Sequence, residues 1–186
     1  MNFSETKLKG AYIIDIQKLE DERGFFARSW CQREVEQYGL EPQVVQCNIS
    51  YNKLRGTLRG MHYQLPPYAE AKLVRCTRGS VFDVIIDLRP REPSFLKWQG
   101  FELSASNYKM LYIPKGFAHG FLTLEDDTEI FYQMSEFYAP DCARGVRWND
   151  PLFDIGWSDS VKCISQKDQS YPDAKPEDFE ALSGKL

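Results

Sequence analysis

Residues 80–88 read Ser80-Val81-Phe82-Asp83-Val84-Ile85-Ile86-Asp87-Leu88, with apolar side chains at odd and at even positions. Alternate residues of a β-strand point to opposite faces, so a strand with this pattern has both faces buried. Val81 to Ile86 is the clearest of several such runs in the chain. We therefore expect this run to lie in the middle of a two-sheet stack or in an oligomer interface.

Short runs of the same kind continue on both sides, separated by turn residues. We expect further strands at Gly10–Ile16, Phe25–Trp30, Gln43–Ser50, Thr57–Gln64, Ala71–Arg78, Lys97–Ser104, Lys109–Ile113, Gly120–Leu124 and Thr128–Phe137. One helix is expected at Ser29–Tyr38, closed by Gly39 in a left-handed conformation. Regularly spaced short strands are typical of an all-β sandwich or barrel, and the mouth of a barrel commonly holds a small-molecule site.

The chain has 186 residues, which suits a single domain spanning 1–186 with one sizeable core. Residues from Tyr171 are rich in Pro, Asp, Glu and Lys, so we expect 172–186 to form a peripheral tail of short helix or loose coil. Hydrophobic residues make up 42% and charged residues 27%, as in ordinary soluble globular proteins. The 12 Phe, 10 Tyr and 4 Trp favour strands, because flat rings fit a pleated, half-buried surface.

The charge and the cysteines restrict the surroundings in which the protein acts. A formal net charge of −4 disfavours a nucleic-acid partner, although Arg and Lys can still converge on a small anionic substrate. The five cysteines are scattered and contain no C-x-x-C pair, so we expect reduced thiols in a cytoplasmic protein. We expect no signal peptide, because residues 1–7 are not apolar, and no membrane span, because no apolar run is long enough.

Only two histidines, His62 and His119, are available for chemistry. Taken alone, a histidine in a β protein is more often a hydrogen-bonded structural residue than a catalyst. Metal-binding barrels commonly use a His-x-His pair, but here His62 is followed by Tyr63-Gln64. We therefore expect no metal site.

The alternation of residues along a strand predicts which side chains lie on the same face. In Thr57–Gln64, simple alternation places Arg59 and His62 on opposite faces, unless a bulge at Gly60 resets the pattern. In Thr128–Phe137, Tyr132 shares a face with apolar Ile130 and Met134. A tyrosine there packs in the core unless its hydroxyl meets a polar cavity.

An ordered series of motifs runs along the chain. It consists of Asp21–Phe26, Gly56–Gln64, Ala71–Arg75, Phe82–Arg89, Ile113–Phe121, Arg147–Pro151 and Ser165–Asp168. In order and spacing this series closely resembles the dTDP-4-dehydrorhamnose 3,5-epimerase family, from about residue 5 to about residue 172. No single motif is decisive, but the ordered set is highly specific.

The resemblance implies a metal-free cupin, a jelly-roll β-barrel that forms a homodimer by exchanging N-terminal strands. The implied substrate is a nucleoside-diphosphate 4-keto-6-deoxy sugar, whose ketone acidifies the hydrogens on C3 and C5. A base removes a proton to leave an enolate, and an acid returns one to the opposite face. No cofactor is implied, in agreement with the lack of a Gly-rich dinucleotide motif after any early strand.

The resemblance also assigns roles to residues. By position, His62 matches the general base, and an imidazole suits this task at neutral pH. Asp168 matches the carboxylate that orients this histidine, and Tyr132 matches the acid on the opposite side of the sugar ring. Lys72 resembles the residue beside the ketone oxygen, where an ammonium stabilises the enolate.

Other positions resemble substrate-binding residues. Arg23 and Arg59 match residues that neutralise the diphosphate, for which a guanidinium fork is well suited, and Arg23 is expected from the partner subunit. His119 resembles a histidine near the sugar or phosphate, and Tyr138 resembles the ring that stacks on the base. The remaining expected polar contacts are Gln46, Asn48 and Lys167.

Some features depart from the family pattern. The family often has a carboxylate at the positions of Arg28 and Ala143, both associated with the nucleotide, and residues 48–58 contain one residue more than the commoner pattern. Thymidine is the default base of the family, and these departures leave another nucleotide open. The alternatives are an epimerase that inverts one centre only, a 3,4-ketoisomerase, a non-catalytic sugar-nucleotide binder and a metal-dependent cupin enzyme.

Overall fold

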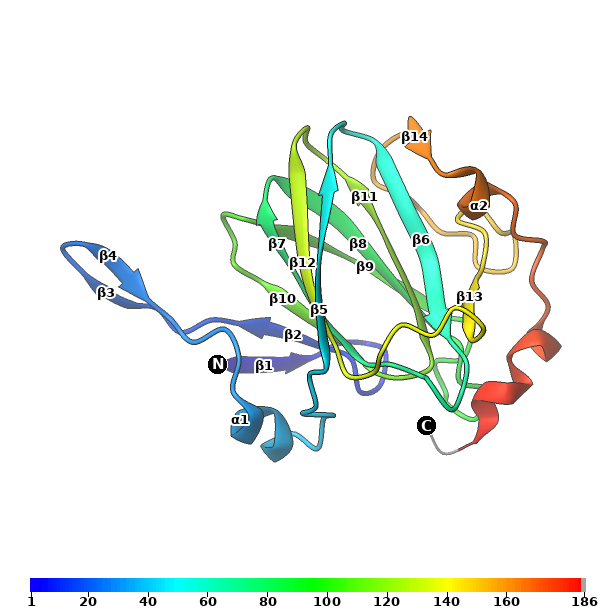
Figure 1. The fold of residues 1–186 in the computed structure, drawn as a ribbon, viewed down its shortest axis with the longest axis horizontal. Helices are drawn as coiled ribbons and strands as arrows, with labels where there is room; N and C mark the ends of the chain where they lie inside the picture. The colour runs from blue at the N-terminus through cyan, green and yellow to red at the C-terminus, as the bar shows by residue number, and fades with distance from the viewer. Residues whose placement is uncertain (185–186) are drawn as a thin grey trace.

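The computed structural model describes residues 1–184, which form two antiparallel sheets stacked face to face (Figure 1). The first sheet has the strand order β1 (Asn2–Glu5), β2 (Tyr12–Asp15), β10 (Met110–Ile113), β7 (Lys72–Arg78), β12 (Thr128–Met134) and β5 (Gln46–Asn52). The second has the order β13 (Ala143–Gly145), β6 (Thr57–Gln64), β11 (Phe117–Thr123), β8 (Ser80–Asp87) and β9 (Trp98–Ser104). The short β14 (Cys163–Ile164) runs parallel to β6. The expectation of an all-β sandwich or barrel is confirmed.

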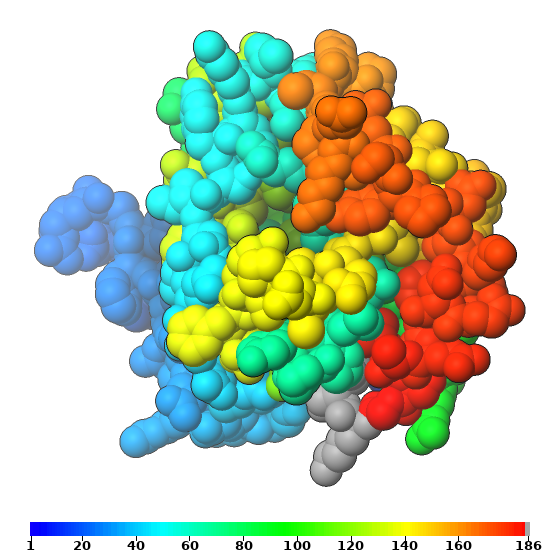
Figure 2. Space-filling view, turned by 45° about the vertical axis from the view of Figure 1, so that its right-hand side comes forward, coloured from blue at the N-terminus to red at the C-terminus, as the bar shows by residue number. Residues whose placement is uncertain are grey.

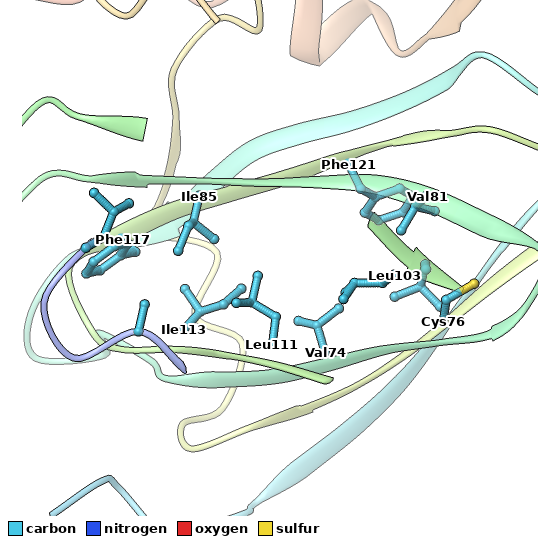
Figure 3. Packing of buried hydrophobic residues seen from close by; sticks show 12 residues of the cluster. Val74, Cys76, Val81, Ile85, Leu103, Leu111, Ile113, Phe117 and Phe121 are labelled. Carbon is cyan, nitrogen blue, oxygen red and sulfur yellow. The ribbon is translucent and has the colours of Figure 1, made fainter. Parts of the chain in front are cut away.

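Strand β8 is buried on both faces, as residues 80–88 predict. Val81 and Ile85 point into the core between the two sheets, where they pack with Val74 and Leu111 of the opposite sheet (Figure 3). Val84, Ile86 and the following Leu88 belong to a second cluster. Since β8 lies between β11 and β9, it is an interior strand of its sheet.

The second cluster is completed by the C-terminal segment. A 3-10 helix, η1 (Pro176–Ser183), inserts Phe179 and Leu182, each only 1% exposed, beside Phe153 and Tyr63. The short helix expected within 172–186 is therefore present, but it is not peripheral, because its two apolar residues complete the core. Residues 185–186 lie outside the described part of the chain.

The segment between β2 and β5 differs most from expectation. The strand expected at Phe25–Trp30 ends at Phe26, because β4 (Gly24–Phe26) pairs only with β3 (Leu19–Asp21) in a hairpin that projects from the body (Figure 1). The helix expected at Ser29–Tyr38 is shorter, α1 (Gln32–Gln37). Gly39 follows it with a φ of +68°, so the predicted left-handed ending is confirmed.

Among residues 1–184, no helix is long and apolar enough to cross a membrane.

Candidate active site

A cleft opens where one edge region of the first sheet faces the second sheet. It consists of two adjoining cavities of about 530 and 400 Å³, and both are lined by His62, Lys72, Tyr132 and Lys167. Figure 2 shows the hollow between the cyan segment that contains β5, the yellow segment near residue 140 and the orange segment that contains α2 (Gln166–Gln169). The structure thus brings residues from separate motifs to one site.

His62 and Asp168 form the central contact of the cleft. The imidazole Nε2 lies 2.7 Å from Asp168 Oδ1, and Asp168 is buried while the ring of His62 is half-exposed. Burial would raise the pKa of Asp168, but the hydrogen bond and charge of His62, with smaller contributions from Gly60 and Ser165, outweigh it and lower the pKa. The ionised carboxylate accepts the Nε2–H, which leaves Nδ1 as the ring nitrogen able to take a proton.

The position of Asp168 is set by the start of α2. Ser165 caps this helix, and its side-chain oxygen accepts a hydrogen bond of 3.0 Å from the Asp168 backbone N–H. The Gly60 N–H donates to Asp168 Oδ2 over 3.4 Å. The carboxylate is therefore fixed by its own helix and by β6 together.

A bulge in β6 explains how Arg59 and His62 line the same cavity. His62 pairs with His119 of β11, but Arg59 pairs with Phe121, so β6 uses one residue more than β11 over this stretch. Gly60 lies in the bulge with a φ of +127°, and a Cβ there would lie 2.5 Å from the Gly120 Cα. Of the two possibilities that the sequence left open, simple alternation or a bulge at Gly60, the structure has the bulge, and only glycine fits this position.

Tyr132 and Lys72 approach the cleft from the first sheet. They lie on the adjacent strands β12 and β7, where Tyr132 pairs with Val74 and Met134 pairs with Lys72. Burial raises the pKa of Tyr132, the charge of Arg59 lowers it and the charge of Glu70 raises it further. The phenol is thus held in its proton-bearing form, on the sheet opposite to His62.

The other expected substrate contacts divide between the two cavities. Arg59 lies in the larger one, where its Nε donates to the buried Asn52 Oδ1 at 2.7 Å. His119 lies there too, bonded to the buried Asp83 at 2.9 and 3.0 Å. The smaller cavity is lined by Gln46, Asn48 and Tyr138. Within residues 1–184, no group of three or more His, Cys, Asp or Glu side chains is placed to hold a metal ion.

Arg23 is the one expected site residue that lies away from the cleft. It occupies the tip of the β3–β4 hairpin, its side chain is 82% exposed, and it is bonded to Asp21. Of the two departures from the family pattern, Ala143 lines the smaller cavity, whereas Arg28 is paired with Glu34 at 2.5 Å near α1.

The cleft also contains residues that the sequence did not single out. Glu70 is buried, lines the smaller cavity and lies 2.5 Å from Lys72 Nζ. Arg144 lines the same cavity from β13. Glu70 lies two residues before Lys72 in the sequence, and strand alternation places both side chains on one face. This spacing could have indicated that Glu70 lies beside Lys72.

A third hollow, of about 690 Å³, contains none of the expected residues. Its cations are Arg89, Arg91 and Lys115. Arg89 is paired with Asp87 at 2.7 Å and Lys115 with Glu41 at 3.2 Å, while Arg91 shares the hollow with the acid Glu92. It therefore offers less uncompensated positive charge than the cleft.

Comparison with known proteins shows which family the chain resembles. The model of the family described as dTDP-4-dehydrorhamnose 3,5-epimerase matches residues 5–175. The chain is 43% identical over 178 residues to the dTDP-4-dehydrorhamnose 3,5-epimerase of Shigella flexneri, covering 94% of this chain and 98% of the relative. The chain belongs to the dTDP-4-dehydrorhamnose 3,5-epimerase family.

Two solved structures of sugar-nucleotide epimerases resemble this chain. The epimerase of Legionella pneumophila, solved in complex with dTDP-4-keto-L-rhamnose, superposes with a TM-score of 0.82 at 37% identity, covering 90% of this chain and 89% of that one. A 3'-monoepimerase of Streptomyces bikiniensis, in complex with dTDP-quinovose, also gives a TM-score of 0.82, at 30% identity, covering 90% and 85%.

Membership of the epimerase family confirms three expectations: the family itself, the cupin-type jelly-roll fold and the enzyme class of isomerases.

Proposed function

We propose that this protein inverts C3 and C5 of dTDP-4-dehydro-6-deoxy-D-glucose to give dTDP-4-dehydro-L-rhamnose. The observation that carries the proposal is the placement of His62 on β6 and Tyr132 on β12, on opposing sheets that line one cleft. A base and an acid on opposite sides of a sugar ring are what inversion of a carbon centre requires. The names of the relatives supply the substrate.

Each inversion is a pair of proton transfers. His62 takes the proton from the carbon beside the ketone, and the electrons of the broken C–H bond form an enolate with its negative charge on the ketone oxygen. The Lys72 ammonium donates a hydrogen bond to that oxygen. Tyr132 then forms the new C–H bond on the opposite face, and the enolate electrons return to the carbon. Solvent removes the proton from His62 and restores the one on Tyr132.

The cationic groups of the cleft are proposed to bind the diphosphate. Arg59 is held by Asn52 with part of its guanidinium still available, and Lys167 lines both cavities. Gln46, Asn48 and Tyr138 are proposed to contact the nucleotide and sugar from the smaller cavity, with His119 beside the sugar or phosphate.

A homodimer is proposed because the β3–β4 hairpin has no core of its own. Leu19 is 68% exposed and Phe26 is 72% exposed on an arm that projects from the body (Figure 1). Insertion of this arm into a second copy would bury both side chains. It would also place Arg23 of the arm in the partner's cleft, beside the diphosphate. The five free cysteines support a reducing, cytoplasmic location.

The test is hydrogen exchange in heavy water with dTDP-4-dehydro-6-deoxy-D-glucose, followed by NMR. Deuterium is expected at both C3 and C5, together with the L-rhamno configuration. His62→Ala is expected to abolish incorporation while the circular dichroism spectrum and melting temperature stay near those of the parent. Near-normal turnover of His62→Ala would show that the base is another group.

A second candidate function is inversion of one centre only. The observation in its favour is the similarity to the 3'-monoepimerase, together with Arg28 and Ala143 at positions where the family often has carboxylates. Deuterium at one carbon alone would select it, and a panel of nucleotide 4-keto sugars would show which base is accepted.

A further inference from the structure

The smaller cavity contains a buried ion pair whose acid has no assigned role. Glu70 is 8% exposed, and its Oε1 lies 2.5 Å from the Nζ of Lys72, which is 9% exposed. Its second oxygen, Oε2, is buried without a hydrogen-bond partner in the described part of the chain. A carboxylate that serves packing alone normally has both oxygens satisfied, so this one invites a functional explanation.

The charged residues around Lys72 indicate which charge Glu70 balances. The cations that line the cleft with Lys72 are Arg59, Arg144 and Lys167, and the imidazoles are His62 and His119. Among the described residues only two carboxylates, Asp168 and Glu70, line the same cleft. Asp168 is bonded to His62, so Glu70 is the acid left to balance the Lys72 ammonium.

The backbone fixes Glu70 relative to Tyr132. Its neighbour Ala71 accepts a hydrogen bond of 3.0 Å from the Ser135 N–H and donates one of 2.8 Å to the Ser135 hydroxyl. Ser135 follows directly after β12, the strand that carries Tyr132. The start of β7 and the end of β12 are therefore tied together beside the cavity that Glu70 and Tyr132 both line.

We propose that Glu70 is a positioning residue of the proton-transfer site: its carboxylate holds the Lys72 ammonium toward the substrate ketone and keeps Tyr132 in its neutral, proton-donating form. A buried ammonium is stable as an ion only beside a counter-charge. A negative charge near a phenol disfavours its ionisation, in agreement with the effect of Glu70 on the pKa of Tyr132, which follows those of burial and Arg59. The inference rests on the roles proposed for Lys72 and Tyr132.

The test is Glu70→Gln, which keeps the size of the side chain and removes its charge. We expect kcat to fall about tenfold to a hundredfold, with KM for the dTDP-sugar and affinity for dTDP within about twofold of the parent. In protein labelled with ¹³C-tyrosine, the Tyr132 signal, identified by its loss in Tyr132→Phe, is expected to titrate at lower pH than in the parent. The matched control is Glu92→Gln, which removes the acid of the surface pair Lys9–Glu92 at 3.1 Å and is expected to change neither quantity.

The proposal requires that both kcat and the pH at which Tyr132 titrates change in Glu70→Gln. If folded Glu70→Gln keeps the parental value of either quantity, the proposal is overturned. If Glu70→Gln does not fold, Glu70→Asp replaces it: the charge stays but is withdrawn from Lys72, so kcat is expected to fall while Tyr132 titrates near its parental pH. A parental kcat in Glu70→Asp would then overturn the proposal. The titration of Tyr132 can be measured without turnover, so it tests this inference independently of the proton-transfer roles. Those roles are tested directly by His62→Ala and Tyr132→Phe.

Discussion

Asp168 is held at several points, and this decides what His62 can do. Its Oδ1 lies 2.7 Å from His62, its Oδ2 accepts from Gly60, and its backbone N–H is capped by Ser165. The imidazole is thereby fixed in one tautomer with Nδ1 available, which prepares it to accept a proton without reorganisation. Tyr132 differs, because its surroundings keep its proton on. At the residue scale, the environments of these two groups agree with the roles proposed for them, His62 as base and Tyr132 as acid.

Tyr132→Phe is expected to uncouple hydrogen exchange from inversion. His62 would still remove a proton and return a deuteron to the same face, so label would enter the substrate with its configuration retained. Inversion is expected to fall by about 10² to 10⁴, the usual contribution of a general acid. NMR of the substrate recovered from heavy water distinguishes the two processes. Parallel loss of exchange and inversion would contradict the assignment of Tyr132 as the acid alone.

Asp168→Asn is expected to lower kcat by about 100-fold or more, because an amide does not stabilise the imidazolium. The substitution is also expected to change how the stability of the protein depends on pH. The folded-state pKa of Asp168 is lowered, with burial outweighed by the contacts to His62, Gly60 and Ser165. The contribution of a group with a lowered pKa is present above its unfolded pKa and is lost as pH falls through its folded pKa.

The measurement is the melting temperature of the parent minus that of Asp168→Asn, followed from pH 6 down through the acid range. This difference is expected to shrink as the pH falls below about 4, near the unfolded pKa of an aspartate. Asp141→Asn, at an exposed aspartate, is the control. A melting-temperature difference that grows toward low pH would contradict the prediction.

At the scale of elements, the sequence predicted the bounds of several strands to within one residue, and β8, expected at Ser80–Leu88, spans Ser80–Asp87. The bounds of β6, Thr57–Gln64, are those expected from its flanking residues. The sequence did not predict β1, β13 or β14, which have between two and four residues each, because such short strands depend on the partner with which they pair. In β6 the sequence left a bulge open at Gly60, and the structure shows the corresponding register shift.

Gly60→Ala is expected to destabilise the protein by about 2–5 kcal/mol, from strain at positive φ added to overpacking. The new Cβ would lie 2.5 Å from the Gly120 Cα and 2.9 Å from the His119 carbonyl oxygen, both backbone atoms that cannot swing aside. Denaturant unfolding measures the loss. Gly39→Ala is the control, because Gly39 has a φ of +68° but no atom within 4 Å of the position of a Cβ, and it lies outside the β3–β4 arm. Equal losses in the two variants would show that contact with β11 is unimportant.

At the scale of the whole molecule, the cleft within one chain is incomplete for the proposed substrate. Every expected contact except Arg23 lines one of the two cavities. Ordered motifs could predict His62, Lys72, Tyr132 and Asp168, because these match a family pattern residue by residue. They could not predict Arg144, whose place in the cleft comes from packing between distant strands. Strand alternation could place Glu70 on the same face as Lys72, but the motifs gave Glu70 no role. We propose that the arm that carries Arg23 reaches the cleft of a second copy.

Mixing two inactive variants tests whether Arg23 acts across subunits. Arg23→Ala and His62→Ala are each expected to lose most activity, the first by weakening diphosphate binding and the second by removing the base. In a heterodimer, the chain with Arg23→Ala keeps His62 and receives an intact Arg23 from its partner, so one of its two clefts is complete. Random reassociation at equal concentrations is therefore expected to restore about a quarter of the parental sites. If Arg23 instead served its own chain, no cleft of the mixture would hold both residues and activity would stay at the level of the separate variants.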